Sequence, residues 1–412
     1  MADAWISLLI GGILLLVGFA ASLVFERYGV PDFFMLLLLG VLLGHIPVEP
    51  FGSGMVAALG PILPAFIGLT LAMIMFEGGL SLNVARTGRG VGVLACHILG
   101  AMALTIVLTW FLATRVLGLS DLTGIVLAAA FSGPSASIVL SFAPHIGLSQ
   151  KALGAIVLEG VLGNVVAAVV VLMALQLPGP LGAEGLVPFL SQVGLSASMA
   201  LIVGLAWRTA TESLLPFKFQ YIATLALAVV VFAFAEGLVG GNGAIAAFVF
   251  GLVLGFRKRH SVAIEGIEGA GLQAFQKEIT FGLRTFFFVY LGLLIQFSSF
   301  SLAALVGAGL LVLAFIGARV PTSLGLGRAY RLDGHDTRVV IATVGRGMTD
   351  VVLVLLALES GLLPPAEGGF LLGLLPLVIL LAAIACAGLL TWAGRATPGS
   401  ALSHATEDIY HE

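Results

Sequence analysis

Residues 151–177 combine a long apolar stretch with two side chains of the kinds that bind protons and cations. After Lys151, only Glu159, Asn164 and, at the far end, Gln176 interrupt a run of apolar and small residues. About 20 such residues suffice to cross the hydrocarbon core of a bilayer, so the stretch predicts a membrane helix. A carboxylate near the middle of that helix is costly in lipid, and we expect it to carry a function. The structural alternative is an interhelical hydrogen bond made by a protonated Glu159.

Two other apolar stretches are interrupted by residues that loosen a helix. Proline removes a backbone donor, and glycine costs helix stability, so both stretches are expected to break. The interruptions are Ser132, Gly133, Pro134 and Ser135 in the first stretch, and Gly345, Arg346 and Gly347 in the second. The serine hydroxyls and the carbonyl of Asn164 are neutral oxygen ligands for a monovalent cation, and Asp350 adds a second deeply placed acid.

Basic residues at membrane depth need partners, because an unpaired Arg there is expensive. Glu159 is the expected partner of Arg319. Arg346 and Asp350 are four residues apart and would share one face of a continuous helix, as a structural or a functional pair.

The helices that must position these residues follow from composition. The chain has 412 residues, of which 60% are hydrophobic and 9% charged, against roughly 25% charged in a soluble domain. The sequence therefore predicts an all-α polytopic membrane protein. Its thirteen apolar spans lie near 4–25, 31–46, 62–82, 90–114, 122–145, 151–177, 185–207, 219–238, 241–256, 279–297, 302–323, 337–358 and 367–394.

The two breaks occupy matching places in the chain. Gly133 lies 129 residues after residue 4, where the first span starts, and Arg346 lies 127 residues after residue 219, where the eighth starts. Spans one to six and eight to thirteen thus predict two copies, which the odd seventh span makes inverted. Inverted repeats with paired broken helices are typical of secondary transporters with a site at the midplane. The opposed half-helix ends carry partial charges there, and acidic or basic side chains must compensate these charges.

Lysine and arginine set the orientation. With the N-terminus outside, the inner loops hold fourteen basic residues and the outer loops hold only Arg115. We therefore expect a cell-membrane protein with a cytoplasmic C-terminus. The net charge of −3 gives no hint of nucleic acid, and no P-loop or soluble domain indicates ATP or another cofactor.

Five motifs in order resemble those of the cation–proton antiporter superfamily, in particular its thirteen-helix sodium/proton and potassium/proton exchangers. They lie at 75–89, 159–171, 284–295, 317–325 and 345–358 and extend over nearly the whole chain. The resemblance implies exchange of a monovalent cation for protons and a homodimer made by spans one to three and eight to ten. It also divides the chain into scaffold helices 1–83 and 211–300, core helices 84–177 and 301–395, a linker helix 178–210 and a cytoplasmic tail 396–412.

The chain departs from the exchanger motifs at two places. Asn164 stands where the exchangers carry the acid that binds cation and proton, and Ser132-Gly133-Pro134 stands where their break usually reads Thr-Asp-Pro. The residue sequence of this break resembles more closely that of the potassium-efflux branch of the superfamily. Asn164 can coordinate a cation but cannot titrate. The proton is then carried by Glu159 or Asp350, or the protein is no longer a conventional exchanger.

Two alternatives stay open from the sequence. A transporter of the same fold could carry an organic anion held by Arg319 or Arg346, which would explain the missing acids. A membrane-embedded enzyme would need His97, the only histidine at depth, but a lone membrane histidine more often bonds a neighbouring helix. Since no HExxH motif or pair of catalytic aspartates accompanies His97, we expect a transporter and not an enzyme.

Overall fold

The protein was analysed in a computed structural model. The structure describes residues 12–23 (except 14 and 22), 32–46, 53–82, 90–136, 139, 146–176, 183–213, 219–256, 268–295 and 301–395. Within these ranges the regular structure is helical, as the composition predicts. Most of the first predicted span, the short loops with Arg27, Arg86 and Arg257, and the predicted tail lie outside the described residues.

Most helices follow the predicted apolar spans to within a few residues, but α12 (Glu268–Leu294) begins eleven residues before the predicted 279 and α13 (Leu302–Tyr330) ends seven residues after the predicted 323. The described elements are α2 (Asp32–Gly44), α3 (Ser53–Leu59), the 3-10 turn η1 (Gly60–Ile62), α4 (Leu63–Ser81), α5 (Val91–Phe111), the π turn η4 (Leu112–Val116), α6 (Asp121–Ala130), α8 (Gln150–Gln176), α9 (Ala183–Ser213), α10 (Gln220–Gly237), α11 (Gly243–Gly255), α12 (Glu268–Leu294), α13 (Leu302–Tyr330), α14 (Gly334–Ala342), α15 (Met348–Glu359) and α16 (Pro365–Arg395). The helix α8, for example, begins one residue before the predicted span and ends one residue before its predicted end.

Seven of the described helices are long and apolar enough to cross a membrane. They cover residues 54–81, 92–116, 150–176, 187–211, 220–237, 302–330 and 365–394. Large apolar side chains on their outer surfaces are exposed, such as Ile202 at 68% and Leu313 at 64%. A soluble protein rarely leaves such surfaces to water, so the protein is a multi-pass membrane protein.

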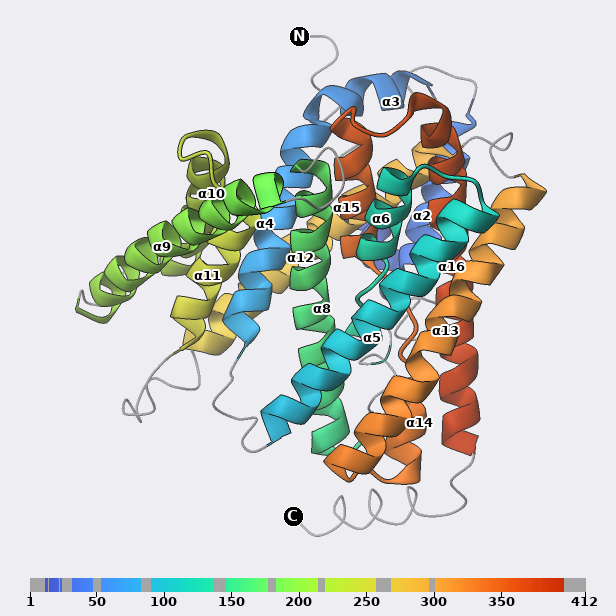
Figure 1. Ribbon diagram of the computed structural model, residues 1–412. Helices are drawn as coiled ribbons and strands as arrows, with labels where there is room; N and C mark the ends of the chain where they lie inside the picture. Colours follow the sequence, from blue (N-terminus) through green and yellow to red (C-terminus); the bar gives the residue numbers. More distant parts are fainter. Residues whose placement is uncertain are drawn as a thin grey trace.

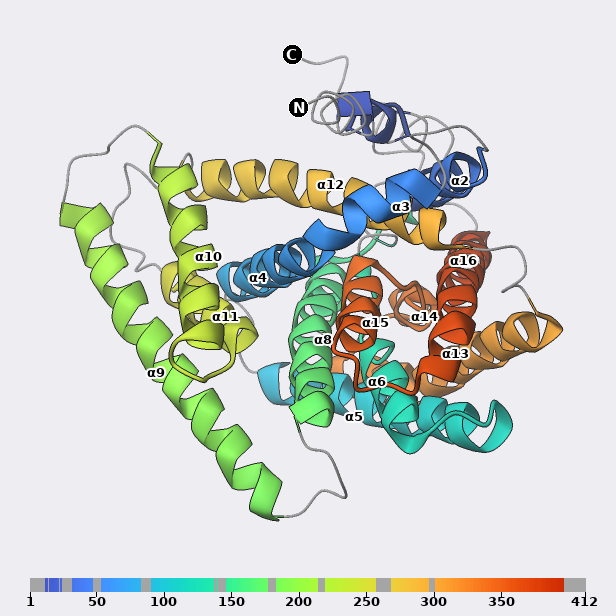
Figure 2. The same ribbon diagram turned by 90° about the horizontal axis from the view of Figure 1, so that it is seen from above.

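The helices form two neighbouring groups (Figures 1 and 2). In the first group, α10 and α11 pack beside α4, α9 packs against α10 and α11, and α12 packs along α2. In the second group, α5, α6, α8 and α13 to α16 pack together, with α13 lying between α5 and α16. The two groups meet where α4 contacts α8 and α15, where α12 contacts α15 and α16, and where α11 contacts α8.

Glycines bring two helix pairs of the first group into backbone contact. A Cβ added to Gly79 of α4 would lie 2.6 Å from the backbone nitrogen of Leu252 on α11. A Cβ on Gly292 of α12 would lie 2.7 Å from Cα of Gly40 on α2. Since real Cβ atoms do not approach backbone this closely, the two crossings require glycine.

Both predicted helix breaks are present. The helix α6 ends at Ala130, and residues 131–135 that follow are not helical. Residues 343–347 separate α14 from α15 in the same way. Each interruption therefore leaves backbone groups without their usual intrahelical partners, deep inside the second group.

Candidate functional site

The two breaks lie against each other and are joined by hydrogen bonds. The Ser135 backbone N–H donates to the carbonyl oxygen of Gly345 at 2.9 Å. The Arg346 guanidinium donates from Nη1 to the carbonyl oxygen of Gly133 at 2.7 Å. Gly347 lies so close to Ser135 that an added Cβ would be 2.7 Å from the serine Oγ. The residues singled out at the two breaks, more than 200 positions apart in the chain, thus form one crossing.

The crossing packs directly on α8. A Cβ on Gly133 would lie 2.8 Å from the backbone carbon of Gly163, and a Cβ on Gly160 would lie 3.0 Å from Cβ of Ala136. Small residues on both sides let the broken backbone reach α8 without an intervening side chain. Asn164, which follows Gly163 and is half-buried, is therefore placed beside the crossing together with the buried Ser132.

Glu159 and Arg319 form the buried pair that their cost in a membrane predicts. The Arg319 guanidinium donates from Nη1 to Glu159 Oε1 and from Nη2 to Glu159 Oε2, the latter at 3.1 Å. Nη2 also donates to the carbonyl oxygen of Val340 on α14 at 2.7 Å. Both side chains are almost completely inaccessible to solvent. The pair therefore ties α8 to α13 and to the helix that leads into the second break.

His97 of α5 is the third member of this cluster. Its Nε2 lies 3.5 Å from Glu159 Oε2, and its Nδ1 lies 3.1 Å from the carbonyl oxygen of Thr322 on α13. The sequence indicated only that a lone membrane histidine bonds a neighbouring helix, which it does. The contact with Glu159 was missed because no local spacing connects two residues on separate helices.

Arg346 and Asp350 do not form the salt bridge that their spacing suggested. Within the described residues, the Asp350 carboxylate instead accepts from the Gly347 backbone N–H at 2.6 Å. The Arg346 guanidinium carbon lies 3.9 Å from the centre of the Phe315 ring. The expected pairing is wrong because residues 343–347 are not helical, so the two residues do not share a helix face. Each charge instead compensates a half-helix end: Arg346 meets a carbonyl after α6, and Asp350 meets the backbone N–H of Gly347, the N-cap of α15.

A serine and an acid fasten each broken span at its outer end. Ser120, the N-cap of α6, donates its backbone N–H and its hydroxyl to the two carboxylate oxygens of Glu367 on α16, at 2.9 and 3.0 Å. Asp336 of α14 accepts the hydroxyl of Ser149 and, at 3.3 Å, its backbone N–H. Ser149 in turn accepts from the backbone N–H of Ala152 in the first turn of α8. The two contacts lie near opposite ends of the second group (Figure 1).

One known family matches the chain over most of its length. The family model described as sodium/hydrogen exchanger, transmembrane, matches residues 12–392. The chain belongs to the sodium/hydrogen exchanger family. The matched range includes the crossing, Glu159, Arg319 and Asp350.

Relatives of this exchanger-family chain include two described antiporters. The K(+)/H(+) antiporter NhaP of Alkalimonas amylolytica is 28% identical over 147 residues, which are 35% of this chain and 25% of that protein. The K(+)/H(+) antiporter NhaP2 of Shewanella oneidensis is 25% identical over 370 residues, which are 86% of this chain and 61% of that protein. The chain thus spans between a quarter and about three fifths of these relatives' length.

A solved structure has the same fold. The sodium proton antiporter MjNhaP1 from Methanocaldococcus jannaschii, at pH 8, superposes with a TM-score of 0.76 and 18% sequence identity. The superposition covers 94% of this chain and 100% of that chain. The likeness establishes the exchanger-family fold of the chain.

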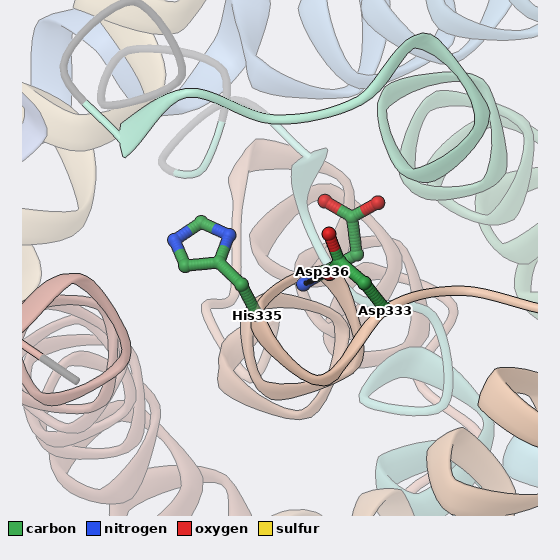
Figure 3. A group of neighbouring side chains, drawn as sticks. All are labelled: Asp333, His335 and Asp336. Atoms are coloured by element: carbon green, nitrogen blue, oxygen red, sulfur yellow. Dashed lines mark hydrogen bonds between the residues drawn. The ribbon is translucent and has the colours of Figure 1, made fainter. Parts of the chain in front are cut away.

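A separate group of possible metal ligands lies at the start of α14. Ligand atoms of Asp333, His335 and Asp336 all lie within 4.8 Å of one another (Figure 3). Asp333 is the N-cap of α14 and accepts from the Asp336 backbone N–H at 2.6 Å, while both Asp336 oxygens face Ser149. Since the two carboxylates already satisfy helix N-termini, helix capping explains this group.

Proposed function

We propose that the protein exchanges a monovalent cation, Na⁺ or K⁺, for protons by alternating access. The observation that carries the proposal is the crossing of two broken spans beside a buried Glu159–Arg319 pair, in a chain of the sodium/hydrogen exchanger family. Both charged residues and exposed half-helix ends are costly in a membrane, and transporters use them to hold ions. The relatives named as K(+)/H(+) and sodium proton antiporters support the same class of cargo.

The proposed cation ligands are oxygens of Ser132, Ser135 and Asn164 beside the crossing. The Ser132 hydroxyl donates to the Ala129 carbonyl at 2.7 Å, which leaves its lone pairs for a cation. These ligands carry no charge, so a nearby carboxylate must neutralise the ion. Glu159 and Asp350 are the two candidates, and either would let proton and cation compete for one negative charge. This competition couples the two fluxes without ATP.

We further propose thirteen spans in two inverted repeats. Equivalent features are separated by nearly one interval: Gly292 follows Gly79 by 213 positions, Arg346 follows Gly133 by 213, and Gly251 follows Gly40 by 211. The helix N-caps Ser120 and Asp333 are also 213 apart. The pairing of the glycines supports a two-fold relation between the copies, because Gly79 lies against Gly251, and their equivalents Gly292 and Gly40 lie against each other in the same way.

The repeat also fits the proposed roles of the helices as scaffold, core and linker. Residues 1–83 and 211–300 would form a scaffold that makes a homodimer, residues 84–177 and 301–395 a moving core, and residues 178–210 the linker between the two halves. The N-terminus would lie outside, and the tail 396–412 would lie in the cytoplasm. The two packed groups of helices support this division (Figure 2).

The test is a cation jump on proteoliposomes that contain a pH-sensitive dye. Addition of NaCl, KCl or LiCl outside should release protons from the interior with at least one of the cations, and empty liposomes should give no signal. Proton flux that ignores all three cations would contradict the proposal. Uptake of an organic anion under the same conditions would favour the alternative in which Arg319 or Arg346 holds the cargo.

A further inference from the structure

The two ring nitrogens of His97 face groups of the same hydrogen-bonding kind. Nδ1 lies 3.1 Å from the carbonyl oxygen of Thr322, and Nε2 lies 3.5 Å from a carboxylate oxygen of Glu159. Both oxygens can only accept, and only the Nδ1 contact forms a hydrogen bond among the described residues, so the hydrogen of the neutral ring is assigned to Nδ1. The neutral ring has a single N–H, and Nε2 then turns a lone pair toward an oxygen that also offers only lone pairs.

This arrangement leaves Nε2 ready for a proton. The residue is 7% exposed, and Nε2 is buried without a hydrogen-bond partner among the described residues. A proton on Nε2 would convert an unfavourable contact into a charge-assisted hydrogen bond to Glu159. Histidine is a side chain that commonly takes up and releases a proton in proteins.

The charged groups around the ring are few in the described part of the protein. The helix α5 packs against α13, α6, α8 and η4. From α13 and α8 the ring faces Arg319 and Glu159, and the titratable groups of α6 and η4, Asp121 and Arg115, lie at the opposite end of α5. On α5 itself, about 27 Å of helix separates His97 from residue 115 at 1.5 Å per residue. Protonation of His97 therefore acts first on the Glu159–Arg319 pair.

We propose that Nε2 of His97 is a proton-binding site that adjusts the cation affinity of the crossing to pH. With the ring neutral, Arg319 balances Glu159 and the three residues carry no net charge. A proton taken from water onto Nε2 makes the net charge +1, and its return to water restores zero. Glu159 precedes Asn164 by five residues, about 7.5 Å along α8, so this charge opposes a cation at the crossing. The proposal rests on the proposed exchange, and it assigns the pH response to a residue distinct from the carboxylate that couples the fluxes.

The first test follows the ring itself and needs no transport. In nitrogen-15 NMR spectra of histidine-labelled protein in nanodiscs, the His97 signals are those missing from the His97→Asn variant. We expect Nδ1 to stay protonated and Nε2 to gain a proton as the pH is lowered from about 8 to about 6. Saturating NaCl or KCl should lower the pH at which Nε2 takes up its proton. A bound cation and a proton on Nε2 repel each other, so each weakens the binding of the other. A ring that keeps one protonation state over this range, or that ignores both salts, overturns the proposal.

The second test measures cation affinity by flux in proteoliposomes. The His97→Asn side chain keeps a donor for the Thr322 carbonyl but removes Nε2. In the native protein, the apparent cation affinity should fall as the pH is lowered from about 8 to about 6. His97→Asn should remove about fivefold or more of that fall, the lower end of typical coupling between two sites. His335→Asn, in the helix-capping group of α14, is the matched control and should behave like the native protein.

The two tests separate this proposal from the exchange on which it rests. If the native protein exchanges cations for protons and His97→Asn has an unchanged pH dependence, the His97 assignment fails and the exchange stands. If the native protein shows no cation-dependent flux, the proposed exchange fails, and the NMR titration with and without salt still decides whether His97 binds a proton opposed by a cation.

Discussion

Arg319 and Glu159 are 160 positions apart in the chain and meet through two N–H···O contacts in the interior. The same guanidinium reaches the Val340 carbonyl just before the second break. One side chain therefore links α8, α13 and α14, and it does so where water is excluded.

Removal of either partner should be costly. A buried charge left without its partner typically destabilises a protein by about 3–5 kcal/mol. We expect Arg319→Ala to lower the free energy of unfolding more than the double variant Glu159→Ala/Arg319→Ala, measured by denaturant unfolding of the purified protein in detergent. Simple additivity of the two single effects would mean that the pair contributes no coupling energy.

Charge-neutral substitutions should separate the roles of the two acids. Asp350→Asn keeps an oxygen for the Gly347 N–H but removes the proton site, and we expect it to abolish cation-driven proton flux. Glu159→Gln should retain flux with a shifted pH dependence, because Arg319 holds this carboxylate ionised. Flux through each variant in proteoliposomes decides between them, with reconstituted amounts matched. Full cation-dependent flux in both variants would favour the organic-anion alternative.

The close contact between the crossing and α8 should not tolerate a methyl group. A Cβ on Gly163 would lie 3.0 Å from Cα of Gly133, which belongs to the backbone and cannot rotate away. We expect Gly163→Ala to reduce the rate of cation-driven flux at least about tenfold, roughly 1.4 kcal/mol in the barrier. Gly154→Ala on the same helix has open space around the new Cβ and is the matched control. It should preserve flux and slightly stabilise the helix, by up to about 1 kcal/mol. Equal effects of the two variants would show that the contact does not matter.

Asn164→Asp restores an acid at the position where the exchangers carry one. Asn164 is half-buried beside the crossing, so a carboxylate there would be near the proposed cation ligands. We expect a steeper pH dependence of flux or a change in the charge moved per cycle, recorded as current on a solid-supported membrane. A variant with native pH dependence and native current would place the ion elsewhere.

The orientation is testable with single cysteines. The fourteen-to-one distribution of basic residues predicts a cytoplasmic C-terminus. Ala405→Cys, in a background without Cys96 and Cys386, should react with a membrane-impermeant maleimide only after the cells are opened. Labelling of intact cells would overturn the predicted topology.

The sequence predicted those parts of the fold that depend on local composition. Most apolar spans matched helices within a few residues, with α12 and α13 longer than predicted. Gly133-Pro134 and Gly345-Arg346-Gly347 marked real breaks, because proline removes a backbone donor and glycine weakens a helix. The Glu159–Arg319 pair was predictable as well. Opposite charges at membrane depth are costly when unpaired, so the two residues were expected to pair with each other.

Apart from the Glu159–Arg319 pair, contacts between distant side chains could not be predicted from the sequence. The spacing of Arg346 and Asp350 indicated a helix pair, but the break itself removed the helix on which that inference depended. The contact of His97 with Glu159, and the contacts of Ser120 with Glu367 and Ser149 with Asp336, join separate helices. No local periodicity encodes such pairings, so three-dimensional packing was needed to find them.

The two serine–acid contacts fix the outer end of each broken span to a neighbouring helix. A span that is interrupted in its middle bends easily unless its ends are fixed to neighbouring helices. Here Glu367 fixes the start of α6 and Asp336 fixes the start of α8, near opposite ends of the second group of helices. A displacement of α16 at one end of the group is therefore passed to α6, and a displacement of α14 at the other end is passed to α8.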